Sequence, residues 1–330
     1  MKVSDMTNCP KCGCVCKPGD AFCQDCGANL TEPTVVLAEE CRCGSTRFRA
    51  DGICARCGRT RPALSGEFVV GPGIAAVTDV GITHQHNDDA FAIAGPQIGG
   101  VGSIVVVCDG VSNSQTPDVA AAVGVAAARE GIQASLAGGM TAEDAVRWGI
   151  TKAHEAVCAV PYDQNHPIDP PAATIAIAVV LEAPGGRRHV TTAWLGDSRV
   201  YWLRRSGGLL LTRDHSWRNM VVDQGEMTDQ EARKSKMAHA IVKCLGLSDH
   251  PSDPAFMPEP SIETVDLPAN GWLMVCTDGL WNYAEAPTAL AEAADDALLQ
   301  DEALQVCRKL VEFAKAKGGH DNITIGVAKL

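Results

Sequence analysis

The sequence lacks an excess of positive charge and lacks long apolar runs. It carries 28 Lys and Arg against 40 Asp and Glu, for a formal net charge of −12. Nucleic acids and anionic membranes select clustered cations, so this balance argues against both as general partners. No apolar run reaches the length that spans a bilayer, and residues 1–5 lack the apolar centre of a signal peptide. We therefore predict a cytoplasmic protein without a membrane partner.

The composition is that of a folded globular chain. Hydrophobic residues make up 46% and charged residues 21% of 330 residues, which supports a sizeable core. This length exceeds the usual single domain, so we expect two or more units. A phosphate substrate remains compatible with the acidic balance if bound cations reverse the local field.

Cysteine is concentrated at the start of the chain: ten of 15 cysteines lie in the first 57 residues. The spacing of Cys9, Cys12, Cys23 and Cys26 forms two C-x-x-C pairs and resembles a zinc ribbon. Four thiolates at such spacing bind Zn²⁺ tetrahedrally, and in a reducing compartment this is favoured over disulfides. Cys14 and Cys16 lie inside the loop and compete as ligands. Residues 1–30 are therefore predicted to form a zinc module.

A second set consists of Cys41, Cys43, Cys54 and Cys57, and its C-x-C half is atypical for a ribbon. We expect one or two structural Zn²⁺ ions in all, because so few residues cannot build a core without metal. We predict a second module over residues 31–62, with linkers at 31–34 and 59–66, and a main domain over 63–330. The remaining cysteines stand in apolar contexts and are interpreted as buried free thiols.

The main domain is predicted to contain blocks of strands and pairs of helices, which favours sheets layered between helices. Helices are expected at 117–137, from 141 to about 160, and at 301–317, the second with Thr141 as its cap. Strands are expected at 104–108, 174–181, 189–194, 200–203, 271–276 and 323–328.

Aspartates follow these strands in a recurring pattern, each beside glycine or asparagine. The pattern occurs at Asp109, Asp197, Asp278 and Asp321, and Asp88–Asp89 precede another strand. A single one would be an ordinary turn residue. Together they form a ligand set that Mg²⁺ and Mn²⁺ prefer, and two such ions support attack of water on a phosphoryl group.

From about residue 75 onward, the chain resembles the metal-dependent PPM-type (type 2C) serine/threonine phosphatases. The motifs, in the family's order, are GITHQHNDDA (81–90), VCDG (107–110), AAT (172–174), GDSR (196–199), LTRDHS (211–216), CTDGLW (276–281) and GHDNIT (319–324). Each is weak alone, but seven in order are highly specific. The resemblance implies an α/β fold of α+β type, a four-layer α-β-β-α sandwich with two metals at one end.

The resemblance also implies roles for the aspartates in hydrolysis of phosphoserine and phosphothreonine by a water bridged between two ions. Asp109 would bridge two Mn²⁺ or Mg²⁺ ions, and the Gly110 carbonyl would bind one of them. Asp278 and Asp321 would hold the other. Asp88 or Asp89 would contact an ion through metal-bound water. Asp197 would help to bind a weaker third ion.

Three positions depart from the family pattern. His84 stands where an arginine usually holds the substrate phosphate, so phosphate binding would fall to a histidine. Asp88 stands where glutamate is common, and Val111 replaces a histidine of several eukaryotic members. No G-x-S-x-G elbow is present, and the C-x₅-R spacings at Cys41–Arg47 and Cys43–Arg49 begin at predicted zinc ligands, so no protein nucleophile is expected.

Two alternatives stay open. The chain would be a weak pseudophosphatase if His84 fails to bind phosphate. It would instead be a docking or regulatory protein if the cysteine modules carry the function, and arginines around the second module give it a local basic face. The expected partners are phosphorylated proteins, with a docking partner for the modules. We expect residues 1–62 to regulate or localise the enzyme without being needed for its chemistry.

Overall fold

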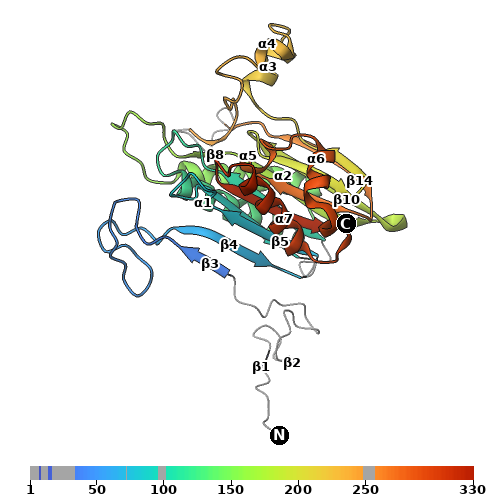
Figure 1. Ribbon diagram of the computed structural model, residues 1–330, viewed down its shortest axis with the longest axis horizontal. Coiled ribbons are helices and arrows are strands. Elements are labelled where there is room, and N and C mark those ends of the chain that lie inside the picture. Colours follow the sequence, from blue (N-terminus) through green and yellow to red (C-terminus); the bar gives the residue numbers. More distant parts are fainter. Residues whose placement is uncertain (1–6, 9–13, 17–33, 72, 96–101, 248–256) are drawn as a thin grey trace.

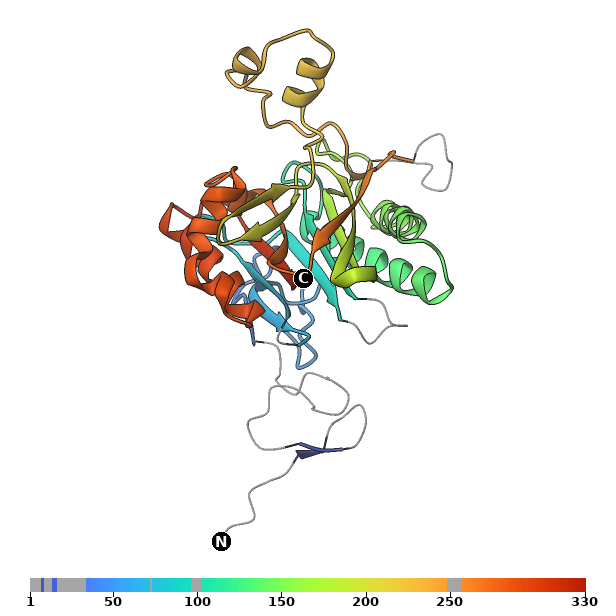
Figure 2. The ribbon, with the colours of Figure 1, turned by 90° about the vertical axis from the view of Figure 1, so that its right-hand side faces the viewer.

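The computed structural model describes residues 7–8, 14–16, 34–71, 73–95, 102–247 and 257–330. Within these residues, two antiparallel sheets lie face to face, and helices cover both outer faces (Figures 1 and 2). The predicted four-layer order is therefore confirmed. Across the described ranges, no helix is both long and apolar enough to cross a membrane.

The first sheet has five strands in the order β14-β10-β9-β7-β6. These are β6 (Asp89–Ala94), β7 (Ser103–Asp109), β9 (Ile175–Ala183), β10 (Arg187–Leu195) and β14 (Ser261–Pro268). Central strands β7 and β9 are β-branched runs buried on both faces, because one face meets helices and the other meets a sheet.

Two helices cover the outer face of this sheet: α1 (Pro117–Ala137) and α2 (Ala142–Cys158). Pro117 lies in the first turn of α1, where its missing N–H is not required. The Thr141 hydroxyl accepts a hydrogen bond from the Asp144 amide (3.1 Å) and caps α2, as its sequence predicts. Alanines and small aliphatic side chains of both helices form a buried cluster with β7 and β9.

The second sheet has seven strands in the order β12-β11-β15-β16-β5-β4-β3. These are β3 (Thr34–Leu37), β4 (Ala63–Val69), β5 (Ile74–Asp79), β11 (Arg199–Arg204), β12 (Gly207–Leu210), β15 (Trp272–Cys276) and β16 (Ile323–Lys329). Its outer face is covered by α5 (Asp278–Trp281), α6 (Pro287–Ala294) and α7 (Ala303–Ala316).

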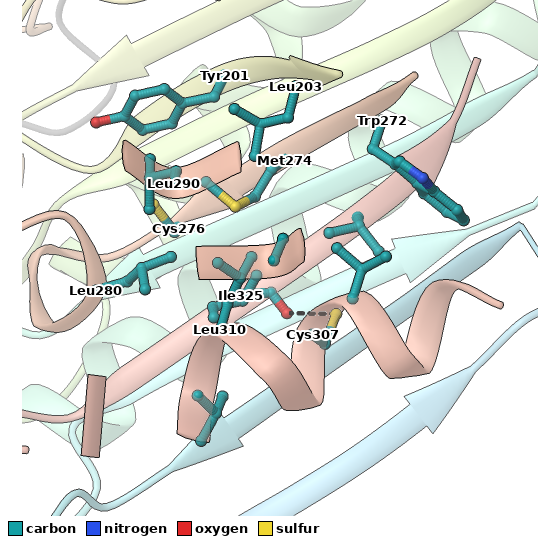
Figure 3. Close-up of a cluster of buried hydrophobic side chains, with 14 of the residues drawn as sticks. Tyr201, Leu203, Trp272, Met274, Cys276, Leu280, Leu290, Cys307, Leu310 and Ile325 are labelled. Atoms are coloured by element: carbon teal, nitrogen blue, oxygen red, sulfur yellow. Dashed lines mark hydrogen bonds between the residues drawn. The ribbon is translucent and has the colours of Figure 1, made fainter. Parts of the chain in front are cut away.

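The contact between this sheet and its helices is a dense apolar cluster (Figure 3). Met274 and Ile325 of the sheet lie against Leu310 and Cys307 of α7, and the Cys307 thiol donates to the Ile325 carbonyl at 3.7 Å. Cys108, Cys276 and Cys307 are fully buried, so the interpretation as core thiols is confirmed for these three, whereas it is wrong for Cys158 and Cys244, which are only half-buried. A third apolar cluster fills the space between the two sheets.

Short elements complete the described chain. They are β1 (Thr7–Asn8), β2 (Val15–Cys16), β8 (Ala172–Ala173), β13 (Leu245–Gly246), α3 (Trp217–Asp223), α4 (Asp229–Ala232) and the 3₁₀ turns η1 (Pro184–Gly186) and η2 (Asp295–Leu299). Helices α3 and α4 belong to a segment that projects away from the sandwich (Figures 1 and 2).

The boundary between the second cysteine module and the main domain differs from our expectation. Strand β3 pairs with β4 and forms the edge of the seven-stranded sheet. The linker interpretation is therefore wrong for Thr34 and for residues from Ala63 onward. Residues 38–62 instead form a loop between two adjacent strands, so the sheet anchors this loop at both ends (Figure 1).

Candidate active site

The predicted aspartates meet at one end of the two sheets, although they come from distant parts of the chain. Asp89 begins β6 and pairs in register with Asp109, which ends β7. Asp278 follows β15 at the start of α5, and Asp321 precedes β16. Asp197 lies in the turn between β10 and β11. The structure thus brings together the carboxylates that the sequence pattern singled out.

Hydrogen bonds between the two sheets hold this end together. The Thr277 hydroxyl donates to Asp89 Oδ2 (2.8 Å), which joins the end of β15 to the start of β6. Asn322 accepts from the Asp88 amide (2.7 Å) and donates to the Val80 and His86 carbonyls (3.0 Å each). Asn322 therefore ties the loop that carries Asp88 to the segment that carries Asp321. Thr277 and Asn322 occur within the family motifs, but their spacing did not reveal these contacts.

Glycine is required beside two of the aspartates. A Cβ on Gly110 would lie 2.4 Å from the Pro117 carbonyl oxygen and 2.7 Å from the Asp88 carbonyl oxygen. A Cβ on Gly279 would lie 2.0 Å from the Asn322 carbonyl oxygen. These close approaches explain the Asp-Gly pairs, since any side chain would push the neighbouring backbone out of the site.

The carboxylates repel one another in a buried setting. Burial, followed by the charges of Asp89, Asp278, Asp197 and Asp321, raises the pKa of Asp109 well above its usual range. Burial also raises the pKa of Asp89 and of Asp197. Burial and the charge of Asp321 raise the pKa of Asp278 to about 6. Without cations, the site favours protonated carboxyls, and divalent ions would remove this electrostatic cost.

These residues fit hard divalent ions by donor chemistry, because carboxylate and carbonyl oxygens are the ligands such ions prefer. In the described chain, no group of three or more carboxylates is as tightly gathered as the cysteine sulfurs discussed below. The acidic set is wider than the ligand shell of a single ion.

His84, the predicted phosphate-binding residue, lies at the rim of the acidic site. Its Nε2 is 3.5 Å from Asp321 Oδ1, and its side chain is 46% exposed. The side chain therefore faces one of the carboxylates from the solvent side.

Residues farther from the centre support the site. Arg199 donates to both oxygens of Asp214 (2.8 and 2.7 Å), and its guanidinium stacks 3.6 Å from the centre of the buried Trp281 ring. Asp214 and Arg199 thus form a structural support beneath the site, and Trp281 packs against this pair.

Four cysteines of the second module form a compact cluster. The sulfurs of Cys41, Cys43, Cys54 and Cys57 all lie within 4.8 Å of one another, with Cys41 and Cys54 buried. A hydrogen bond from the backbone of Cys57 is the main cause that lowers the pKa of Cys54 to about 6, which favours a thiolate.

The turns of this cluster have the expected form. Gly44 and Gly58 adopt left-handed backbones (φ 76° and 75°), as tight turns after a pair of ligands require. The other predicted zinc ligands, Cys9, Cys12, Cys23 and Cys26, lie outside the described residues.

Arg42 joins this cluster to the acidic site. Its guanidinium forms an ion pair with the Asp88 carboxylate, and its Nε lies 3.3 Å from Asp118 Oδ2 in the first turn of α1. Burial and then the charge of Arg42 lower the pKa of His86, which lies between the two parts. Sequence reasoning counted Arg42 only as part of a basic face. Its one distinctive signal is its position between two ligand cysteines.

Comparisons with known proteins agree with this geometry. A family model described as protein phosphatase 2C matches residues 82–315. The protein phosphatase PhpP of Streptococcus pneumoniae is 30% identical over 138 residues, which are 42% of this chain and 52% of PhpP. The chain thus spans about half the length of this relative. The serine/threonine phosphatase stp of Listeria monocytogenes is 25% identical over 258 residues, 75% of this chain and 92% of stp.

Solved structures share the fold. The PPM Ser-Thr phosphatase MsPP of Mycobacterium smegmatis, in complex with cacodylate, is 26% identical, with a TM-score of 0.57 over 78% of this chain and 97% of its own. The catalytic domain of Mycobacterium tuberculosis PstP, solved with two manganese ions, is 23% identical, with a TM-score of 0.57 over 78% of this chain and 96% of its own.

Proposed function

Because the chain belongs to the protein phosphatase 2C family, we propose that it is a metal-dependent phosphatase acting on phosphoserine and phosphothreonine in proteins. The observation that carries the proposal is the cluster of mutually repelling carboxylates, buried at Asp89 and Asp197 and half-buried at Asp109, Asp278 and Asp321, at one end of the sandwich. A site of this kind costs free energy unless cations occupy it, and divalent cations can activate water for attack on a phosphoryl group.

Proteins of this family use divalent metal ions, and the donor set of this chain fits Mn²⁺ or Mg²⁺. Asp109 would serve both ions, the Gly110 carbonyl would help to hold one of them, and Asp278 and Asp321 would hold the other. Asp88 or Asp89 is assigned to an outer position and Asp197 to a third, weaker ion. When bound, the ions supply water activation and neutralise charge on the phosphoryl group.

The chain's own residues then orient this set. Thr277 donates to Asp89, and Asn282 donates to Asp278 Oδ2 (3.1 Å), so each carboxylate keeps one oxygen in a fixed direction. The glycines that follow Asp109 and Asp278 let neighbouring backbone approach the site. Within the family motifs, no serine or cysteine is assigned as a nucleophile, so the reaction is direct hydrolysis.

The proposal is tested by phosphate release from a phosphothreonine peptide with Mn²⁺, with a nucleotide as the control substrate. Release from the peptide and not from the nucleotide is expected. No release from the peptide, by a protein that binds Mn²⁺, would favour a pseudophosphatase. The reason for this alternative is His84, which stands where an arginine usually holds the substrate phosphate. Its side chain faces Asp321 and is 46% exposed.

We also propose that the cluster of Cys41, Cys43, Cys54 and Cys57 binds one structural Zn²⁺, since four close sulfurs suit this ion. Docking of a partner on this module and a cytoplasmic location remain predictions. Zinc content of the purified protein, measured beside its manganese content, tests the metal assignment.

A further inference from the structure

We propose that Arg42, carried by the cysteine module, is a phosphoryl-binding residue of the active site. The inference rests on the proposed phosphatase function and identifies a residue outside the main domain that would contact the substrate phosphate. Three features of the structure support it, namely where Arg42 is held, what holds it, and what charge surrounds it.

The backbone of Arg42 is held on both sides. Its neighbours Cys41 and Cys43 belong to the four-sulfur cluster, and Cys41 is 2% exposed. The Cys41 amide donates to the Ser45 carbonyl (2.9 Å), which closes the turn around the arginine. Since the loop is anchored by β3 and β4, the module sits in a defined place at the end of the sheets (Figure 1). In a C-x-C spacing the middle residue is fixed on both sides by ligand cysteines. Arg42 occupies this position, so its side chain starts from a fixed backbone.

The guanidinium is held by two carboxylates of different kinds. Asp88 belongs to the acidic site, whereas Asp118 lies outside it in the first turn of α1. A negative charge at this helix start is favoured by the helix dipole. Asp118 would keep Arg42 at the rim if Asp88 served the proposed metal site. The Arg42 side chain is only 20% exposed, so this position is a packed one.

The charge around Arg42 is negative, and this is why phosphate binding needs a cationic residue here. The ion pairs of the described residues include one arginine in contact with the aspartates assigned to the metal site, and that arginine is Arg42. A phosphate dianion approaching six carboxylates needs cationic donors in addition to the metal ions. The planar guanidinium offers five N–H donors and suits bidentate contact with phosphate oxygens, which an ammonium does not.

This inference changes our expectation for the module. If Arg42 contacts the phosphoryl group, residues 38–62 form part of the active site and are not only a regulatory or localising element. Removing the module, or releasing its metal, should then weaken phosphate binding.

The first experiment measures binding of inorganic phosphate to the Mn²⁺-loaded full chain by calorimetry, without turnover. We expect Arg42→Ala to weaken phosphate binding by about tenfold or more and Arg42→Lys to be intermediate, because a charged bidentate contact is lost or reduced. The matched control is Arg49→Ala, in the same module, whose side chain pairs with Asp51 and is 59% exposed. Phosphate binding by this control should equal that of the unchanged protein.

Several results would overturn the inference. Equal phosphate binding by Arg42→Ala and the unchanged protein would do so, as would no phosphate binding by the unchanged, Mn²⁺-loaded protein. Tighter phosphate binding or a lower Mn²⁺ requirement in Arg42→Ala would show instead that the guanidinium blocks the metal site. If phosphopeptides are not hydrolysed but phosphate binding depends on Arg42, the proposed function fails and this inference stands.

A second experiment asks whether the sulfur cluster acts through Arg42. Cys57→Ser removes an exposed ligand, and zinc content reports its effect on the cluster. We expect Cys57→Ser to weaken phosphate binding in the unchanged background and to add nothing in the Arg42→Ala background. An equal loss in both backgrounds would contradict positioning of Arg42 by the cluster.

Discussion

The two candidate metal sites of this chain are built in opposite ways. The four sulfurs come from a single loop between β3 and β4, and each lies within 17 residues of the others. The carboxylates come from segments between residues 88 and 321, which only the packing of two sheets brings together. The sulfur site should therefore depend on its metal for its shape, whereas the acidic site is imposed by the core and endures without metal at an electrostatic cost.

The largest expected effect is on catalysis and follows removal of weakly held divalent ions. Gel filtration into metal-free buffer should reduce phosphopeptide hydrolysis to background while zinc stays bound, because thiolates hold zinc far better than carboxylates hold Mg²⁺ or Mn²⁺. Adding millimolar Mn²⁺ should restore the rate. Elemental analysis and phosphate release on the same samples check this, and full activity in excess EDTA would contradict it.

The next largest effect is a difference in kcat between substitutions of two aspartates. Asp109→Asn should lower kcat by about a thousandfold or more, since a bridging carboxylate serves both ions, while Asp197→Asn should lower it by about tenfold. Rates at saturating Mn²⁺ measure the difference. Both variants should fold, because each replacement relieves repulsion in the site. Equal residual rates would refute the assignment.

A smaller effect is expected on stability when the sulfur site is broken. Cys54→Ser should abolish stoichiometric zinc binding, yet shift the main thermal transition by less than about 4 °C. The three apolar clusters that hold the sandwich include no residue of the loop at 38–62. Zinc analysis and calorimetry test this together. Cooperative unfolding of the whole chain in Cys54→Ser would show that the loop supports the core.

The smallest effect is a pH dependence of the metal-free protein. The folded-state pKa of Asp278 is raised, to about 6, so the folded state binds this proton more tightly than the unfolded state does. Stability from this group is therefore present below the unfolded pKa, near 4, and is lost as pH rises through about 6. The whole loss is about 3 kcal/mol, of which about half falls between pH 5 and pH 7.5. Asp278→Asn or Mn²⁺ should flatten this change in urea titrations at the two pH values. A metal-free protein that becomes more stable over this range would contradict the sign.

Much of the fold could be predicted because its signals are local. The β-branched run before Asp109, the alanine-rich helix ended by Gly138, and the Thr141 cap each depend on neighbours a few residues away. The edge strand β3 was missed because its four residues are all exposed and show no alternation of apolar and polar side chains. They form a strand because they pair with β4. The linker interpretation failed at Ala63 because β4 takes its place in the sheet by pairing with β3 and β5.

The ligand types could be predicted from local sequence, as aspartates beside glycines after buried strands and as closely spaced cysteines. Spacing along the chain and the ordered family motifs were sufficient for that. Which residues meet depends on long-range packing: Thr277 contacts Asp89, Asn322 contacts the loop of Asp88, and Arg42 contacts Asp88. These contacts arise where two sheets and a loop pack together, and such long-range packing leaves no periodicity in the sequence from which it could be read.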